Sequence, residues 1–193
     1  MTTIFLARHG ESDWNVEKRF QGHTDRPLTE RGREQAYALA DLVAGEKIDA
    51  IYTSPLSRAQ ETAEIVAARV GLEPVALPEL REVDTGSWSG LSRADVEARF
   101  PEGFARWRSG GSGWEDGETY EEMAERVIGA LGTVAEAHPD GRVLVISHGG
   151  PIRAIHAAAE GLAIDDYRRL RPVEPNARLS TVAVENGRLT RLD

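Results

Sequence analysis

Ile4-Phe5-Leu6-Ala7-Arg8-His9-Gly10-Glu11 and Val143-Leu144-Val145-Ile146-Ser147-His148-Gly149-Gly150 are two stretches built on one plan. Each begins with four consecutive apolar residues, a pattern typical of a strand buried on both faces of a parallel sheet. Each then places a histidine before a glycine where the strand ends. We therefore expect two central strands, with His9 and His148 at their carboxyl ends.

The other strands and helices follow from changes in the period of the apolar residues. Residues 50–52 form a weaker apolar run, and residues 179–184 and 189–192 flank Asn186-Gly187 as the strands of a hairpin do. Apolar residues spaced by three and four predict three amphipathic helices. These residues are Ala36, Leu39, Ala40 and Val43 in the first, Ala59, Ala63, Val66, Ala67 and Val70 in the second, and Met123, Val127, Ala130, Leu131 and Val134 in the third.

Two local features bear on these helices. Ser54-Pro55 predicts the start of the second helix, with the Ser54 hydroxyl as its cap and Pro55 at its first position. Gly129 and Gly132 weaken the prediction of the third helix, because glycine destabilises a helix interior. Alternation of strands and helices predicts an α/β fold of three layers, α/β/α, around a doubly wound, mostly parallel sheet. Ligands of such folds bind beyond the carboxyl ends of the central strands, where both histidines lie.

The domain organisation follows from length and local composition. A chain of 193 residues has the size of one domain, or of one domain with an elaboration. Residues 85–117 are punctuated by glycines and carry Trp88, Trp107 and Trp114. We interpret them as a small insertion over the ligand site expected at the strand ends, within a single domain that spans residues 1–193.

Composition excludes several classes of function. With 23 Lys and Arg against 32 Asp and Glu, the net charge is −9 and the two signs are interspersed, which disfavours nucleic-acid and membrane partners. The chain has no cysteine, so it has neither disulfides nor a thiolate nucleophile. The N-terminus has only a four-residue apolar run before Arg8, too short for a signal peptide or a membrane span. We expect a cytoplasmic protein. The sequence does not decide between a monomer and a homodimer.

The residues around the two histidines indicate an anionic ligand. Glycine after each histidine lets a backbone N–H approach an anion closely, and the start of a helix adds a positive dipole. Arg8 supplies a planar fork of donors that matches phosphate oxygens, as would Arg58 near the start of the second helix. For Arg58, an ordinary place on the helix surface is the alternative.

Five motifs in chain order resemble the histidine phosphatase superfamily, in its phosphoglycerate-mutase-like branch. The resemblance runs from Phe5 to about Val184. Its motifs are Arg8-His9-Gly10-Glu11 with Asn15; Gln21-Gly22 with Pro27-Leu28-Thr29 and Gly32; Ser54-Pro55-Leu56 with Arg58-Ala59 and Thr62-Ala63; Leu80-Arg81-Glu82 with Gly86, Trp88 and Gly90; and Ser147-His148-Gly149-Gly150 with Asn176.

The resemblance implies a role for each matching residue. His9 corresponds to the nucleophile that becomes phosphorylated, Glu82 to the proton donor, and Arg8, Arg58 and His148 to the phosphate pocket. Further substrate contacts are implied for Asn15, Gln21, Gly22 and Gly149. Spacing alone would leave Glu82 a solvated acid beside Glu79 and Asp84. We expect guanidinium charge to lower the pKa of His9, and a hydrogen bond to its other ring nitrogen to select the tautomer. No metal or cofactor is required.

The predicted function is hydrolysis of a small phosphomonoester, with two alternatives. A mutase on the same scaffold would return the phosphoryl group to its substrate. A phospho-ligand binding protein would bind the phosphorylated ligand without converting it. The stretch between Glu82 and His148 is short for a mutase, and Gly150 stands where mutases carry Asn. Retention of the five catalytic positions disfavours a binding protein. The motifs do not identify the substrate.

Overall fold

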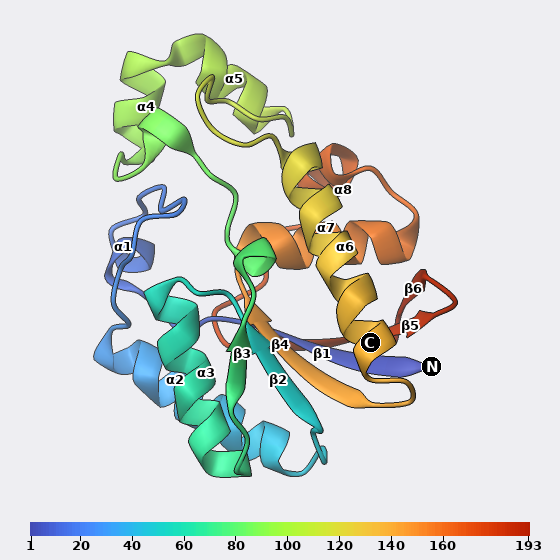
Figure 1. Cartoon of the computed structure of the whole chain (residues 1–193). Coiled ribbons are helices and arrows are strands. Elements are labelled where there is room, and N and C mark those ends of the chain that lie inside the picture. Colours follow the sequence, from blue (N-terminus) through green and yellow to red (C-terminus); the bar gives the residue numbers. More distant parts are fainter.

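The computed structural model describes all residues, 1–193, around one six-stranded sheet of order β3-β2-β4-β1-β5-β6 (Figure 1). Its first four strands in sequence are parallel, while β5 runs antiparallel to β1 and forms a hairpin with β6. Both apolar stretches are central strands, as predicted, and the C-terminal hairpin is confirmed. The short edge strand β3 was not predicted. The strands are β1 (Thr2–Arg8), β2 (Ala50–Thr53), β3 (Pro74–Ala76), β4 (Arg142–Ser147), β5 (Leu179–Glu185) and β6 (Arg188–Arg191).

Both faces of the sheet are buried under helices, which gives the predicted three layers. In β1, Ile4 and Leu6 join the apolar cluster on the face covered by α6 (Tyr120–Ala137) and α7 (Gly149–Glu160). Phe5 and Ala7 join the cluster on the opposite face, covered by α2 (Glu30–Ala44) and α3 (Ser57–Val70). Successive side chains of a strand point to opposite faces, so a continuous apolar run is what this arrangement requires.

The start of α3 differs from the prediction. The helix begins at Ser57, its N-cap is Leu56, and no side chain caps it. The Ser54 hydroxyl instead accepts a hydrogen bond from the Leu56 N–H (3.3 Å) and shares another with His148 Nε2 (2.7 Å). The third predicted helix forms in full as α6, through both glycines, because its buried apolar stripe outweighs their low propensity.

Residues 85–117 contain three short helices beyond the carboxyl ends of the strands, η2 (Gly86–Trp88), α4 (Arg93–Arg99) and α5 (Pro101–Arg108). Trp88 and Trp114 are buried in the same apolar cluster as Ile4 of β1, whereas Trp107 is half-buried and borders a cleft. Two of the three tryptophans therefore pack the insertion onto the sheet's helical layer. The remaining helices are α1 (Asp13–Val16), η1 (Pro78–Leu80) and α8 (Ile164–Leu170).

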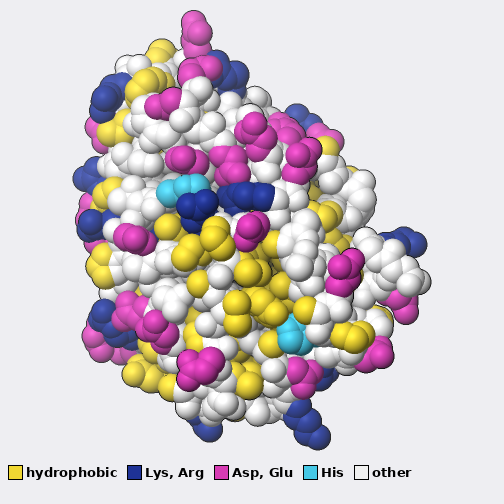
Figure 2. All heavy atoms as spheres, viewed as in Figure 1, with side chains coloured by type: hydrophobic (Ala, Val, Ile, Leu, Met, Phe, Trp, Pro, Cys, Tyr) yellow, Lys and Arg dark blue, Asp and Glu magenta, His cyan; other side chains and the backbone are white.

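The surface is mixed in charge. Figure 2 shows acidic and basic side chains interspersed on the face seen in Figure 1, with apolar side chains gathered between them. Among the helices, none combines the length and the apolar character needed to cross a membrane.

Candidate active site

The pairing of β1 with β4 brings the two histidines together. The strands are parallel neighbours in a register that sets Arg8 opposite Ser147, so the next residue of each strand is a histidine. The His9 N–H donates to the Ser147 carbonyl (3.0 Å), and the centres of the two imidazole rings lie 5.1 Å apart. Both side chains are buried.

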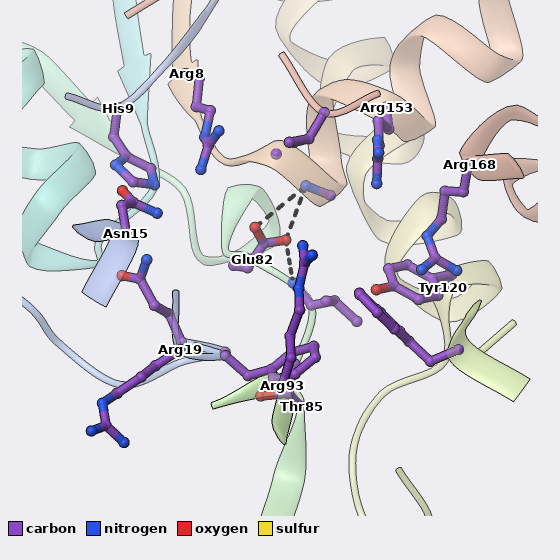
Figure 3. Close-up of a pocket in the computed structure, with 18 of the residues that line it drawn as sticks. Arg8, His9, Asn15, Arg19, Glu82, Thr85, Arg93, Tyr120, Arg153 and Arg168 are labelled. Atoms are coloured by element: carbon purple, nitrogen blue, oxygen red, sulfur yellow. Dashed lines mark hydrogen bonds between the residues drawn. The ribbon is translucent and has the colours of Figure 1, made fainter. Parts of the chain in front are cut away.

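Eight of the nine residues predicted from the sequence line one cleft of about 420 Å³ (Figure 3). The ninth, His148, lies behind it against the His9 ring. The eight are Arg8, His9, Asn15, Gln21, Gly22, Arg58, Glu82 and Gly149. The cleft therefore draws on segments from almost the whole length of the chain.

His9 is held as a neutral imidazole with one free nitrogen. Its Nδ1 lies 2.6 Å from its neighbour's carbonyl, that of Gly10, which accepts only from the Nδ1–H tautomer. Nε2 makes no hydrogen bond within the protein, so its lone pair is available. Burial lowers the pKa of His9 well below its usual value, and the charges of Arg58 and Arg8 lower it further. The direction matches the prediction, but burial is the larger cause.

Arg8 and Arg58 are cations without an acidic partner. Arg8 Nη1 donates to the Glu174 carbonyl (2.7 Å), and Arg58 donates to the carbonyls of Thr24 (2.9 Å) and Gly22 (3.0 Å). The Nε of each arginine is buried and has no partner. Arg58 is 1% exposed, so it is not a helix-surface residue, and burial lowers its pKa to about 10, which keeps it charged at neutral pH. Cationic side chains with buried, unpaired donors of this kind favour a bound anion.

His148 directly precedes α7 and lies against the His9 ring. It is the N-cap of this 12-residue helix, and its Nε2 is engaged by Ser54 while its Nδ1 is buried without a partner. Burial, followed by the charge of Arg58, lowers the pKa of His148 well below its usual value. Gly149, the first residue of α7, lines the cleft where the helix dipole is positive.

Gly10 is not equivalent to Gly149, contrary to the prediction for both glycines. The Gly10 N–H donates to Thr62 Oγ1 (3.1 Å), and a Cβ at Gly10 would lie 2.3 Å from the Gly32 carbonyl oxygen of α2. Glycine is therefore required there because two backbones pack closely. The helix that follows, α1, has only four residues.

Glu82 lies between His9 on one side and Arg153 of α7 on the other (Figure 3). Its carboxylate accepts hydrogen bonds from the N–H groups of Gly150 (3.1 and 3.3 Å) and Val83 (2.9 Å). A Cβ at Gly150 would lie 2.2 Å from Glu82 Oε1, so this position of the carboxylate needs glycine at 150. Arg126, which the sequence did not single out, donates to the Glu82 carbonyl (3.0 Å) and so positions the segment.

The predicted substrate-contact residues also support their neighbours. Asn15 Oδ1 accepts from Asn176 Nδ2 (3.2 Å), which also donates to the His9 carbonyl (2.9 Å). Gln21 Oε1 accepts from Ser12 Oγ (2.9 Å). The Gly22 carbonyl holds Arg58, as described above, so Gly22 acts on the pocket through that arginine. Loop geometry rather than spacing creates these contacts.

Five arginines that line the cleft were not predicted from the sequence. They come from loops and helices scattered along the chain, and no motif spacing marks them. They are Arg19, Arg93, Arg108, Arg153 and Arg168.

Comparisons with known proteins agree with this geometry. The histidine phosphatase superfamily (branch 1) matches residues 4–192. Phosphoserine phosphatase 1 of Hydrogenobacter thermophilus is 37% identical over 169 residues, covering 86% of this chain and 80% of that protein. Phosphoglycerate mutase-like protein 4 of Arabidopsis thaliana is 36% identical over 161 residues, covering 81% of this chain and 70% of that protein.

A solved structure extends the likeness to the fold. The mycobacterial glucosyl-3-phosphoglycerate phosphatase, solved with VO3, matches with a TM-score of 0.88 at 29% identity, covering 98% of this chain and 96% of that one. The family match spans nearly every residue of the chain, including both histidines of the cleft. The chain belongs to the histidine phosphatase superfamily, branch 1.

Proposed function

We propose that this chain is a metal-independent phosphomonoesterase that acts on a small phosphorylated metabolite through a phosphohistidine at His9. The observation that carries the proposal is the neutral His9 imidazole, with its Nε2 free, beside two arginines that lack an acidic partner and whose Nε atoms are buried without a hydrogen bond. Relatives named phosphoserine phosphatase and a structural neighbour named glucosyl-3-phosphoglycerate phosphatase support the reaction class.

In the first step His9 Nε2 attacks phosphorus, and the bond from phosphorus to the ester oxygen breaks. Arg8, Arg58, His148 Nδ1–H and the Gly149 N–H would spread the charge of the phosphoryl oxygens as the transition state forms. The Gly10 carbonyl stabilises the positive imidazole through Nδ1–H. Glu82, protonated at this stage, gives its proton to the leaving alkoxide.

In the second step water attacks the phosphorus of phosphohistidine. Glu82, now ionised, takes a proton from this water, and the bond from phosphorus to Nε2 breaks. Inorganic phosphate leaves, and neutral His9 and protonated Glu82 are restored, so the cycle balances without a metal ion.

Two measurements test the reaction class. The protein should hydrolyse p-nitrophenyl phosphate in EDTA, and rapid quench with labelled substrate should trap an acid-labile, base-stable adduct on His9. Activity that disappeared in EDTA and returned with Mg²⁺ would contradict the proposal. An adduct on another residue would assign the nucleophile elsewhere.

A mutase is the second candidate, because a relative named phosphoglycerate mutase-like covers four fifths of this chain. A mutase must exclude water from its phosphorylated intermediate. Gly150 and a short insertion favour hydrolysis. With 3-phosphoglycerate in ¹⁸O-water we expect inorganic phosphate with one labelled oxygen, whereas faster appearance of 2-phosphoglycerate would favour the mutase.

A further inference from the structure

The cleft carries more positive charge than a single phosphoryl group needs. Seven arginines line it, and Glu82 is its only acidic residue, although the whole chain has a net charge of −9. Arg8 and Arg58 lie beside His9 and suffice for one phosphate dianion. Positive charge elsewhere in the cleft therefore needs another explanation.

Two of these arginines, Arg153 of α7 and Arg168 of α8, form an arginine pair away from the histidines. Figure 3 shows Arg8 and His9 on one side of Glu82, and Arg153 and Arg168 on the other. Arg153 Nη2 donates to the Arg171 carbonyl (3.1 Å), its Nε is buried without a partner, and no acidic side chain forms an ion pair with it. Both side chains line the same cleft. Burial lowers the pKa of Arg153, and the charge of Arg168 lowers it further, whereas the charge of Glu82 raises it.

Arg168 is held rigidly. Its side chain is 4% exposed, and its guanidinium lies over the Tyr120 ring, 3.4 Å from the ring centre. Its Nη1 donates to the carbonyls of Gly110 and Gly111, and the nearest carboxylate oxygen, on Asp165, is 3.9 Å away. Like Arg153, it has a buried Nε without a partner.

A purely structural role accounts for only part of this arrangement. Arg168 Nη1 contacts the carbonyls of Gly110 and Gly111 and so holds α8 against the insertion, which gives this one nitrogen of Arg168 a structural role. Arg153 makes one comparable contact, with the Arg171 carbonyl, and its buried Nε has no partner in the protein. Two neighbouring, largely buried guanidinium groups repel each other, and a bound anion would remove that repulsion. Planar guanidinium groups match the oxygens of carboxylate or phosphate.

We propose that the arginine pair is a second anion subsite, which binds a carboxylate or a second phosphate on the leaving group of the substrate. This inference rests on the proposed phosphomonoesterase function. The preferred substrates are then acidic phosphomonoesters, with one anion at His9 and another at Arg153 and Arg168. Glu82, between the two subsites, faces the ester oxygen that joins them.

Three small esters test the subsite by kinetics: glycerol 3-phosphate, 3-phosphoglycerate, which adds a carboxylate, and glycerol 1,3-bisphosphate, which adds a phosphate. We expect kcat/KM for at least one doubly anionic ester to exceed that for glycerol 3-phosphate by about 10- to 100-fold, the range of one or two charge-assisted hydrogen bonds. Whichever is preferred identifies the second anion. Equal values for all three esters would overturn the proposal.

Variants assign the preference to the arginine pair. Arg153→Gln should lower kcat/KM for the preferred ester at least about tenfold more than for glycerol 3-phosphate. Arg153→Lys keeps the positive charge but loses the planar guanidinium group, so its kcat/KM for the preferred ester should lie between those of the wild type and Arg153→Gln. The matched control is Arg69→Gln, which removes an exposed arginine paired with Asp41 far from the cleft and should preserve the preference. Equal losses on all esters in Arg153→Gln would refute the assignment.

A binding measurement separates this inference from the proposed function. Calorimetry with the His9→Ala variant measures the affinity for the same three esters without turnover. The same measurement on the double variant His9→Ala/Arg153→Gln shows how much of the affinity depends on Arg153. A preference for the doubly anionic esters that depends on Arg153 supports the subsite even if the wild-type protein hydrolyses no ester, an outcome that would refute only the enzyme. Hydrolysis by the wild type without such a preference in binding would refute only the subsite.

Discussion

Replacing Gly150 by alanine should separate the stability of the fold from the function of the cleft. The added Cβ would lie 2.2 Å from Glu82 Oε1 and 3.0 Å from Met123 Sδ. Glu82 Oε1 is at the end of a flexible side chain and Met123 Sδ is one atom from the end of another, so we expect both to move aside without displacing backbone. The carboxylate of Glu82 then leaves the position in which the Gly150 N–H holds it.

The size of the effect follows from the proposed role of Glu82 as the general acid. General acid catalysis contributes about 10²- to 10⁴-fold, so we expect kcat/KM for an alkyl phosphate to fall by at least about 10²-fold, or ~2.7 kcal/mol. p-Nitrophenyl phosphate should lose less than about tenfold, because nitrophenolate leaves without a proton. Stability should change by less than about 1 kcal/mol, since alanine is favoured over glycine in the helix.

The assay compares both substrates in wild type, Gly150→Ala, Glu82→Gln and the double variant, with unfolding midpoints for each. Gly150→Ala and Glu82→Gln should be strongly non-additive if both act through the carboxylate. Gly129→Ala is the matched control, because a Cβ at this exposed position of α6 meets nothing within 4 Å. Equal losses on both substrates, or additive losses in the double variant, would refute the reasoning.

Three further predictions concern the nucleophile, the insertion and the response to pH. His9→Ala should lose the proposed covalent adduct and lower kcat at least about 10³-fold in steady-state assays, because it removes the proposed nucleophile; an adduct that persisted would contradict this. Trp107→Ala should change KM ratios between esters, since Trp107 borders the cleft, whereas Trp114→Ala should instead lower the melting temperature because Trp114 is buried; the opposite pattern would be inconsistent with the packing. Burial lowers the pKa of His156 to about 4, and its Nε2 shares a hydrogen bond with Ser180 (2.9 Å). The unfolded chain, with a histidine pKa of about 6.5, binds the proton first, so stability falls as pH drops from about 6.5 towards 4, by up to about 2 kcal/mol between pH 6.5 and 5. Denaturant unfolding at several pH values should therefore show the stability gap between wild type and His156→Gln narrowing as pH falls, and a gap independent of pH would rule this out.

The sequence by itself determined the central strands, the three long helices and the meeting of the two histidines. These features depend on patterns that are local in the chain. A continuous apolar run needs burial on both faces, and parallel neighbouring strands end at the same edge of the sheet. Once β1 and β4 pair, His9 and His148 follow from the register.

Only the tertiary structure decided how the surrounding groups are used. The sequence predicts Ser54 as a helix cap, but its hydroxyl shares a hydrogen bond with His148, which is 94 residues away in the chain. The sequence predicts that Gly10 lets an anion approach its backbone N–H. In the structure, glycine is required at position 10 because the backbone of Gly32 lies so close. Arg153 and Arg168 carry no motif, and they line one cleft only because α7 packs against α8 and Arg168 contacts the insertion. Hydrogen-bond partners and the surroundings of a charge depend on residues distant in the chain, so local spacing does not encode them.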